Sequence, residues 1–211
     1  FLPTLSLKHK LDVMLGYSAS SDKSANTKVK AEGLIMDKMK WDDLSAIQSK
    51  SNYTISSDSY KVTRQSVFAR ANYSFMSKYY LTVTARADGS SNFAANKKWG
   101  FFPSMALKYN LKNEALFKRQ LWLDNLSLRA SIGRTGNDAI SSYKSMQYYG
   151  SNASGYIFNG EQQLMFAPAQ LENPDLSWET TDSYNIALEA SFLKNRISTT
   201  IEYYGSRTTD L

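Results

Sequence analysis

The sequence predicts an all-β fold class: an antiparallel transmembrane β-barrel, of which this chain supplies about seven or eight strands. Two long strands within residues 79–111 carry the first indication, because their side chains alternate between an apolar and a mixed face. The apolar row of the second strand runs from Trp99 to Leu111, with aromatic residues near both ends. A tilted strand needs roughly 9–11 residues to cross a bilayer, with aromatic belts at the two interfaces. Both features therefore suit a membrane-spanning strand.

The second indication is the spacing of the connections between strands. The shortest turns, 76–78 and 193–195, fall on one side of an antiparallel sheet, and the long segments fall on the other. Bacterial barrels have short periplasmic turns and longer extracellular loops. We therefore expect residues 21–60 and 137–177 outside the cell and the two short turns in the periplasm. A soluble β-sandwich would alternate too, but it has no reason to sort its loops by length.

The third indication is the placement of charge within the predicted strands. Six charged residues in mid-strand positions share the mixed face: Arg70, Arg86, Lys108, Arg129, Glu189 and Glu202. Placing Arg or Lys on the lipid face at the bilayer midplane costs about 2–4 kcal/mol, which gives this sorting a physical cause.

Alternation of apolar and polar residues predicts the individual strands. They cover residues 11–17, 67–75, 79–86, 99–111, 126–133, 184–192 and 197–204, and counting Leu2–Leu7 would add an eighth. The alternation stops over residues 18–63 and again over 135–177. We expect these two stretches to be irregular, the first with at most one short helix at 37–48.

Composition excludes several classes of protein. The 211 residues are 42% hydrophobic and contain no run of about 18 apolar residues, which excludes a helical membrane protein. The absence of cysteine excludes a disulfide framework. The net charge of +6 is scattered along the chain, so we expect no nucleic-acid partner. The start FLPTLSLKHK lacks a signal-peptide pattern, and the final SRTTDL lacks a closing apolar strand, so we expect an internal piece of a longer protein.

No catalytic or metal-binding constellation is visible, so the sequence predicts neither an enzyme nor a bound cofactor. The single histidine, His9, falls in a predicted solvated turn beside two lysines, without a nucleophile held against it. The aromatic residues of the long loops are the candidate substrate-binding residues: Trp41, Tyr148, Tyr149, Tyr156 and Phe158. They can stack on a sugar ring or hold a peptide, or they can form small cores that hold the loops together. Both interpretations stay open.

Several segments carry a family resemblance. The stretch RADGSSNFAANKKWGFFPS resembles the R-x-DGSS-x-F…WG-x-FPS hairpin of SusC/RagA-type TonB-dependent outer-membrane transporters. YSFMSKYYLTVTAR before it, and LDNLSLRASIGRTGND and ENPDLSWETTDSYNIALEASFLKNRISTTIEYYGSRTTDL after it, resemble that family in the same order, and KHKLDVMLGYS near the start fits too. The resemblance covers most of the chain outside two variable stretches, near 21–60 and 139–170.

This resemblance implies a fold, a function and partners. Residues 1–211 would be part of the barrel domain of a roughly 22-stranded transporter, without its plug domain and TonB-interacting segment. The function implied is TonB-dependent import of oligosaccharides or peptides across the outer membrane of a Gram-negative bacterium. The implied partners are a SusD-like surface lipoprotein, the TonB complex, outer-membrane lipid and the imported substrate. A complete eight-stranded barrel serving as an adhesin or anchor, and a soluble β-rich binding module, are the alternatives.

Overall fold

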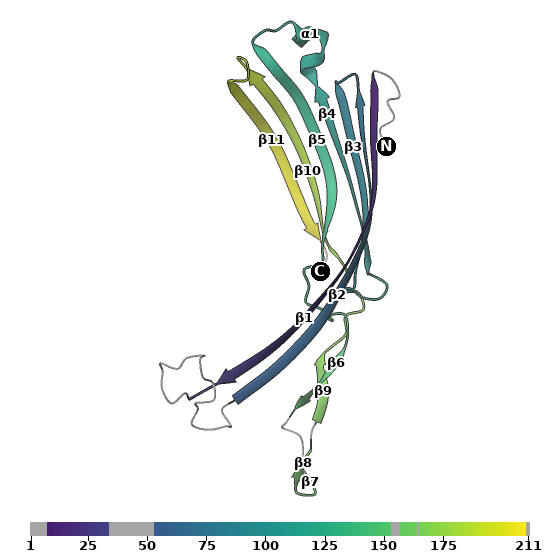
Figure 1. Ribbon diagram of the computed structural model, residues 1–211, viewed down its shortest axis with the longest axis vertical. Coiled ribbons are helices and arrows are strands. Elements are labelled where there is room, and N and C mark those ends of the chain that lie inside the picture. Colours follow the sequence, from purple (N-terminus) through teal and green to yellow (C-terminus); the bar gives the residue numbers. More distant parts are fainter. Residues whose placement is uncertain (1–7, 34–52, 153–156, 164, 210–211) are drawn as a thin grey trace. The chain divides into compact units, whose positions relative to one another are not determined.

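Seven strands form the main sheet of this protein, in the order β1-β2-β3-β4-β5-β10-β11 (Figure 1). The computed structural model describes residues 8–33, 53–152, 157–163 and 165–209. The pairings from β2 to β11 are all antiparallel, and two small hairpins, β6–β9 and β7–β8, form separate sheets. The all-β, antiparallel prediction is therefore confirmed. The suggested extra strand at Leu2–Leu7 lies outside the described residues.

The bounds of the elements are as follows. The main strands are β1 (His9–Ala31), β2 (Tyr53–Phe75), β3 (Tyr79–Ser90), β4 (Trp99–Asn110), β5 (Leu123–Asn137), β10 (Glu179–Phe192) and β11 (Ile197–Thr209). The short strands are β6 (Tyr148–Asn152), β7 (Ile157–Phe158), β8 (Glu161–Gln162) and β9 (Met165–Gln170). Two short helices, η3 (Leu111–Asn113) and α1 (Ala115–Lys118), lie between β4 and β5. Within the part of the chain that the structure describes, no helix is long and apolar enough to cross a membrane.

The chain divides into two compact units, Phe1–Ser20 with Arg64–Leu211, and Ser21–Thr63. The second unit corrects the prediction that residues 18–63 are irregular, because β1 continues to Ala31 and β2 already begins at Tyr53. Most side chains of this ribbon are exposed on both faces. Polar residues on both faces erase the alternation that marks a strand, although the two strands are hydrogen-bonded neighbours. The helix expected at 37–48 lies mainly outside the described residues.

The prediction for residues 135–177 is wrong in a similar way. Strand β5 continues to Asn137, and the two small hairpins occupy most of residues 148–170. Strands of two to six residues are too short to show a period in the sequence. The predicted turns at 76–78 and 193–195 both form, the second extending to residue 196, with left-handed residues such as Met76, Ser77 and Leu193.

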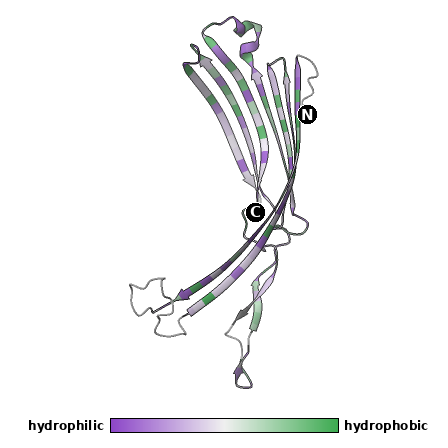
Figure 2. Cartoon of the chain, viewed as in Figure 1, coloured by the Kyte–Doolittle hydropathy of each residue, from purple (hydrophilic) through white to green (hydrophobic). Residues whose placement is uncertain are grey.

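Hydrophobic and hydrophilic residues are interspersed along the main strands (Figure 2), and the strand register sorts their side chains onto two faces. One complete row crosses six strands and is apolar or aromatic throughout: Tyr73, Leu81, Leu107, Ala130, Ile186 and Tyr203. We call the face that carries it the apolar face. The opposite, polar face carries all six charges named above, as predicted.

Aromatic rings gather along one edge of the apolar face. Rings of Phe75, Tyr79 and Tyr109 stack in sequence, with centroid distances of 6.3 and 4.8 Å. His9 joins this row instead of lying in a solvated turn: its ring lies 4.6 Å from that of Phe75, and its Nδ1 is 2.7 Å from the Tyr73 hydroxyl. The expectation for His9 fails because β1 begins at this residue and directs its ring onto the apolar face.

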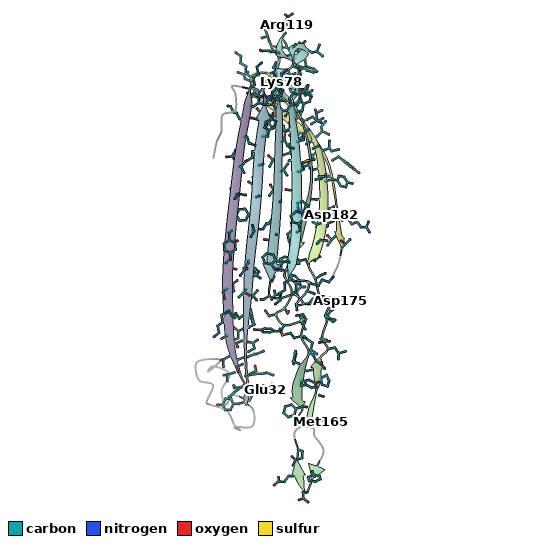
Figure 3. All side chains as sticks on the ribbon, turned by 90° about the vertical axis from the view of Figure 1, so that its right-hand side faces the viewer. Glu32, Lys78, Arg119, Met165, Asp175 and Asp182 are labelled. Atoms are coloured by element: carbon teal, nitrogen blue, oxygen red, sulfur yellow. The ribbon has the colours of Figure 1, made fainter. Side chains whose placement is uncertain are left out.

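Antiparallel strands place the connections of this sheet at two ends. We call residues 76–78, 111–122 and 193–196 the turn end, and residues 91–98 with 138–178 the loop end. Hydrogen bonds join neighbouring connections within each end, such as Asn113 Nδ2 to the Ser77 carbonyl at 2.8 Å. Figure 3 shows Lys78 and Arg119 together at the turn end, well away from Asp182.

Candidate functional site

Alternating charges link four strands across the polar face. Glu189 on β10 accepts from Lys108 Nζ on β4 at 2.7 Å and from Ser127 Oγ on β5 at 3.0 Å. Arg129 lies between two carboxylates, 3.8 Å from Glu189 and 3.3 Å from Glu202 on β11. Two cations and two anions balance, so this part of the polar face is close to neutral.

A second polar group lies on β2 and β3. Arg86 Nε donates to both carboxylate oxygens of Asp88, at 2.6 and 2.7 Å, and its Nη2 donates to Ser66 Oγ at 2.8 Å. The guanidinium also stands 5.3 Å from the centre of the Phe68 ring. Such contacts fix the guanidinium in one orientation, because its planar fork of donors is satisfied from two sides.

Between these two groups the polar face carries a cavity of about 500 Å³. Its walls come from β3, β4, β5 and β10 and include Arg86, Asp88, Ser131 and Thr135. Hydroxyl, carboxylate and guanidinium groups provide both donors and acceptors, as a polar solute requires. The cavity can hold a small polar group against the sheet.

A buried apolar cluster closes the loop end on the polar face. Phe93, Phe102, Leu176 and Trp178 form it, with Ile140 packed against them. The Trp178 ring lies 4.8 Å from Phe93 and meets the edge of Phe102 at 5.3 Å, and its Nε1 donates to the Lys98 carbonyl at 3.0 Å. Residues from the 91–98 loop are thus fixed to the segment that leads into β10.

Two glycines make room for this cluster. A Cβ atom at Gly100 would lie 2.4 Å from the Phe102 ring, and one at Gly136 would lie 2.1 Å from it. Any other residue at either position would push the ring out of its recess. The Gly in the WG-x-FPS motif and the Gly at 136 therefore have a shared structural role.

Asp138 holds the same loops through polar contacts. Its Oδ2 accepts from Arg64 Nε at 2.5 Å and from Ser90 Oγ at 2.9 Å. Asn92 Nδ2 lies 3.2 Å from the backbone carbonyls of both Asp138 and Ile140. The DGSSN stretch is therefore an anchor for the start of the 138–178 segment.

The described members of the predicted aromatic set lie in the small hairpins. Tyr148 and Tyr149 belong to β6 and Phe158 to β7, and their side chains are 54%, 62% and 65% exposed. Among the described ring contacts, none joins these three residues to one another. Trp41 and Tyr156 lie outside the described residues. A role in substrate binding stays a prediction.

Sequence reasoning missed the residues that build the loop-end cluster. Phe93 stands in a polar loop, and Leu176 and Trp178 stand just before a strand, where periodicity gives no signal. The neighbouring Asn-Phe and Leu-Ser-Trp stretches of the quoted motifs were the available hint. Across the described ranges, no group of three His, Asp or Glu residues is placed to hold a metal ion.

Comparisons with known proteins agree on one family. The family described as TonB dependent receptor-like, beta-barrel matches residues 6–211. A TonB-dependent receptor of Formosa agariphila is 34% identical over 203 residues, covering 96% of this chain and 20% of that protein. The TonB-dependent receptor SusC of Bacteroides thetaiotaomicron is 36% identical over 152 residues, covering 71% of this chain and 15% of that protein.

Solved structures of a transporter share the fold. The RagAB peptide importer in its closed-closed state superposes with a TM-score of 0.84 at 26% identity, covering 100% of this chain and 23% of that chain. Its open-open state gives the same TM-score of 0.84. The chain spans about a fifth of the length of the curated relatives that it matches. These matches favour a fragment of a large barrel over the two alternatives, a complete eight-stranded barrel and a soluble β-rich binding module.

Proposed function

Because the chain belongs to the TonB-dependent receptor-like β-barrel family, we propose that it forms part of the wall and loops of an outer-membrane importer in a Gram-negative bacterium. The importer would take up an oligosaccharide or a peptide, with energy supplied through TonB by a segment outside this chain. A SusD-like surface lipoprotein would cover the loop end. The role is transport and not catalysis.

The observation that carries the proposal is the difference between the two faces of one sheet. Aliphatic and aromatic side chains such as Leu107 and Ile186 cover the apolar face, while Lys108, Arg129 and Glu189 form ion pairs on the other. A sheet that separates hydrocarbon from a wet lumen needs this arrangement, since charge in lipid is costly. The equal likeness to two states of the RagAB importer supports a wall that stays the same while other parts move.

The polar face supports a polar cargo. Its 500 Å³ cavity presents hydroxyl, carboxylate and guanidinium groups, from residues such as Thr82, Asp88 and Arg86, beside apolar surface. Sugars and peptides both present many hydrogen-bonding groups. The exposed rings of Tyr148, Tyr149 and Phe158 are suited to stacking on a sugar or holding a peptide side chain.

A pair of neighbouring substitutions tests the wall. Leu81→Arg places a charge on the apolar face, at a cost of about 2–4 kcal/mol at mid-membrane, and should block assembly of the full-length protein. Thr82→Arg, the matched control on the polar face, should assemble. Quantifying the folded protein in outer-membrane fractions compares them. Equal assembly of both variants would exclude the assignment of the faces.

Deletion of TonB tests the source of energy. Uptake of the substrate by the full-length protein should stop in that strain, while binding at the cell surface persists. A barrel of this type is plugged, and opening it needs energy that the outer membrane does not generate itself. Uptake at the normal rate without TonB would instead indicate a passive porin.

A further inference from the structure

We propose that a groove on the apolar face binds one phosphate-bearing lipid of the surrounding leaflet, with the acyl chains at one end and the phosphate at the other. The groove has a volume of about 1030 Å³ and crosses strands β3, β4, β5, β10 and β11. The inference rests on the proposed function, because the apolar face meets lipid only when the chain is part of a barrel wall.

The β3–β4 end of the groove is apolar and is hollowed by small side chains. Ala85 and Pro103 lie directly opposite each other and form its floor. Larger side chains on β4 flank them, Phe101 and Met105, which are 61% and 44% exposed. This combination leaves a hollow between bulky neighbours that acyl chains can fill, because the side chains of this face are apolar here.

The other end of the groove is charged. Arg134, Asp182 and Arg207 are directly opposite one another on β5, β10 and β11. Arg134 donates from Nε and Nη2 to the two oxygens of Asp182, at 2.6 and 2.8 Å. Two guanidinium groups against one carboxylate leave a net positive charge. A phosphate is the complementary ligand, since guanidinium donors match its geometry.

The two ends of the groove lie at different depths in a barrel wall. On β4 the row of apolar side chains continues to Trp99. On β10 it ends at Tyr184, and the next side chain on the same face, towards the loop end, is that of Asp182. Strands tilted by about 35–45° produce such an oblique boundary, because a row across them rises through the bilayer. The charged end therefore reaches the interface while the apolar end stays in hydrocarbon. An amphiphile fits both ends at once, which neither a soluble anion nor a polar peptide does.

The test uses the full-length protein in a non-ionic detergent with monophosphoryl lipid A as the probe, and native mass spectrometry to count retained lipid. The double variant Arg134→Gln/Arg207→Gln should retain the probe about tenfold more weakly, because charge-assisted hydrogen bonds to the phosphate are lost. Ala85→Phe should lower retention similarly by filling the apolar end. Ala130→Phe is the matched control, since it adds the same ring to the apolar face outside the groove.

Three results would overturn the inference. One is equal retention by all four proteins. Another is displacement of the probe by inorganic phosphate at equal concentration, with Ala85→Phe unaffected, which would mean a soluble-anion site. The third is a changed number of protein copies per particle in the groove variants, which would mean a protein interface. Normal assembly of Leu81→Arg would refute the proposed function instead, so the two failures are distinguishable.

Discussion

The two ends of the sheet hold their connections in different ways. At the turn end, two of the three connections, 76–78 and 193–196, are short turns that depend on backbone geometry, with Met76 and Ser77 both left-handed, as tight hairpins require. At the loop end, the buried apolar cluster around Phe93 and the polar contacts of Asp138 fix the chain. The partners there are far apart in sequence: Phe93 packs on Trp178, and Arg64 contacts Asp138.

This difference follows from the length of the 138–178 segment. A short turn loses little conformational entropy, so a few hydrogen bonds suffice to order it. A long loop in water loses far more, and a small apolar core with satisfied polar groups offsets that loss. The loop end therefore has its own core because its 138–178 segment is long. A surface for substrate is best built on such a fixed base.

The largest expected effect concerns the side of the membrane that each end faces. Cysteines introduced at Ser49 and Ser151 in the full-length protein should react with an impermeant maleimide on intact cells, and one at Ser77 should not. The sequence contains no native cysteine that would interfere. Disruption of the cells should make Ser77→Cys reactive, which serves as the control. Labelling of Ser77→Cys alone on intact cells would reverse the two ends.

Removal of an aromatic ring should destabilise the loop end more than the turn end. Phe93 is 1% exposed, so Phe93→Ala should destabilise the loop end by about 3–5 kcal/mol. The matched change at the turn end is Trp122→Ala, whose ring stacks on Phe192 at 5.7 Å but is 55% exposed. Its cost should be about 0.5–1.5 kcal/mol. Hydrogen exchange of each end in the full-length protein measures the difference, and equal costs would contradict the comparison.

The polar contacts of Asp138 should contribute less to the stability of the loop end than the apolar cluster does. Asp138→Asn removes the ion pair with Arg64 and weakens the bond from Ser90, at a cost of about 1–3 kcal/mol. Limited proteolysis within residues 139–178 should become faster. Asp175→Asn makes the same change at an exposed position of that segment and should leave the rate unchanged. A similar acceleration in both variants would mean a general effect of charge.

Alternation predicted the sheet well where the two faces meet different surroundings. Strand β4 begins at Trp99 and ends at Asn110, one residue before the predicted limit. It failed in residues 18–31 of β1, where both faces carry exposed polar side chains. It also could not predict that Phe102, on the polar face, is buried at 7% exposure, because its recess depends on Gly136 and Trp178. Such contacts depend on the folded sheet and leave no local signal.

The smallest expected effect is a pH dependence at the turn end. Lys78 Nζ donates to Glu114 Oε2 at 2.9 Å and the Tyr109 hydroxyl donates to Oε1 at 3.0 Å. These hydrogen bonds, that from Lys78 first, hold the pKa of the Glu114 carboxyl below its ordinary value. A carboxyl whose pKa is lower in the folded state stabilises that state above its unfolded pKa of about 4.3, and the stabilisation is lost as the pH falls through the folded value. Protection factors of turn-end amides, which correct for the slower intrinsic exchange at low pH, should therefore fall on acidification more in the wild type than in Glu114→Gln. The effect is small, since Lys78 and Glu114 are both partly exposed and water screens the pair. Loop-end amides compared in the same samples are the internal control. Identical pH profiles at the turn end for both proteins would show that backbone geometry alone holds that end together.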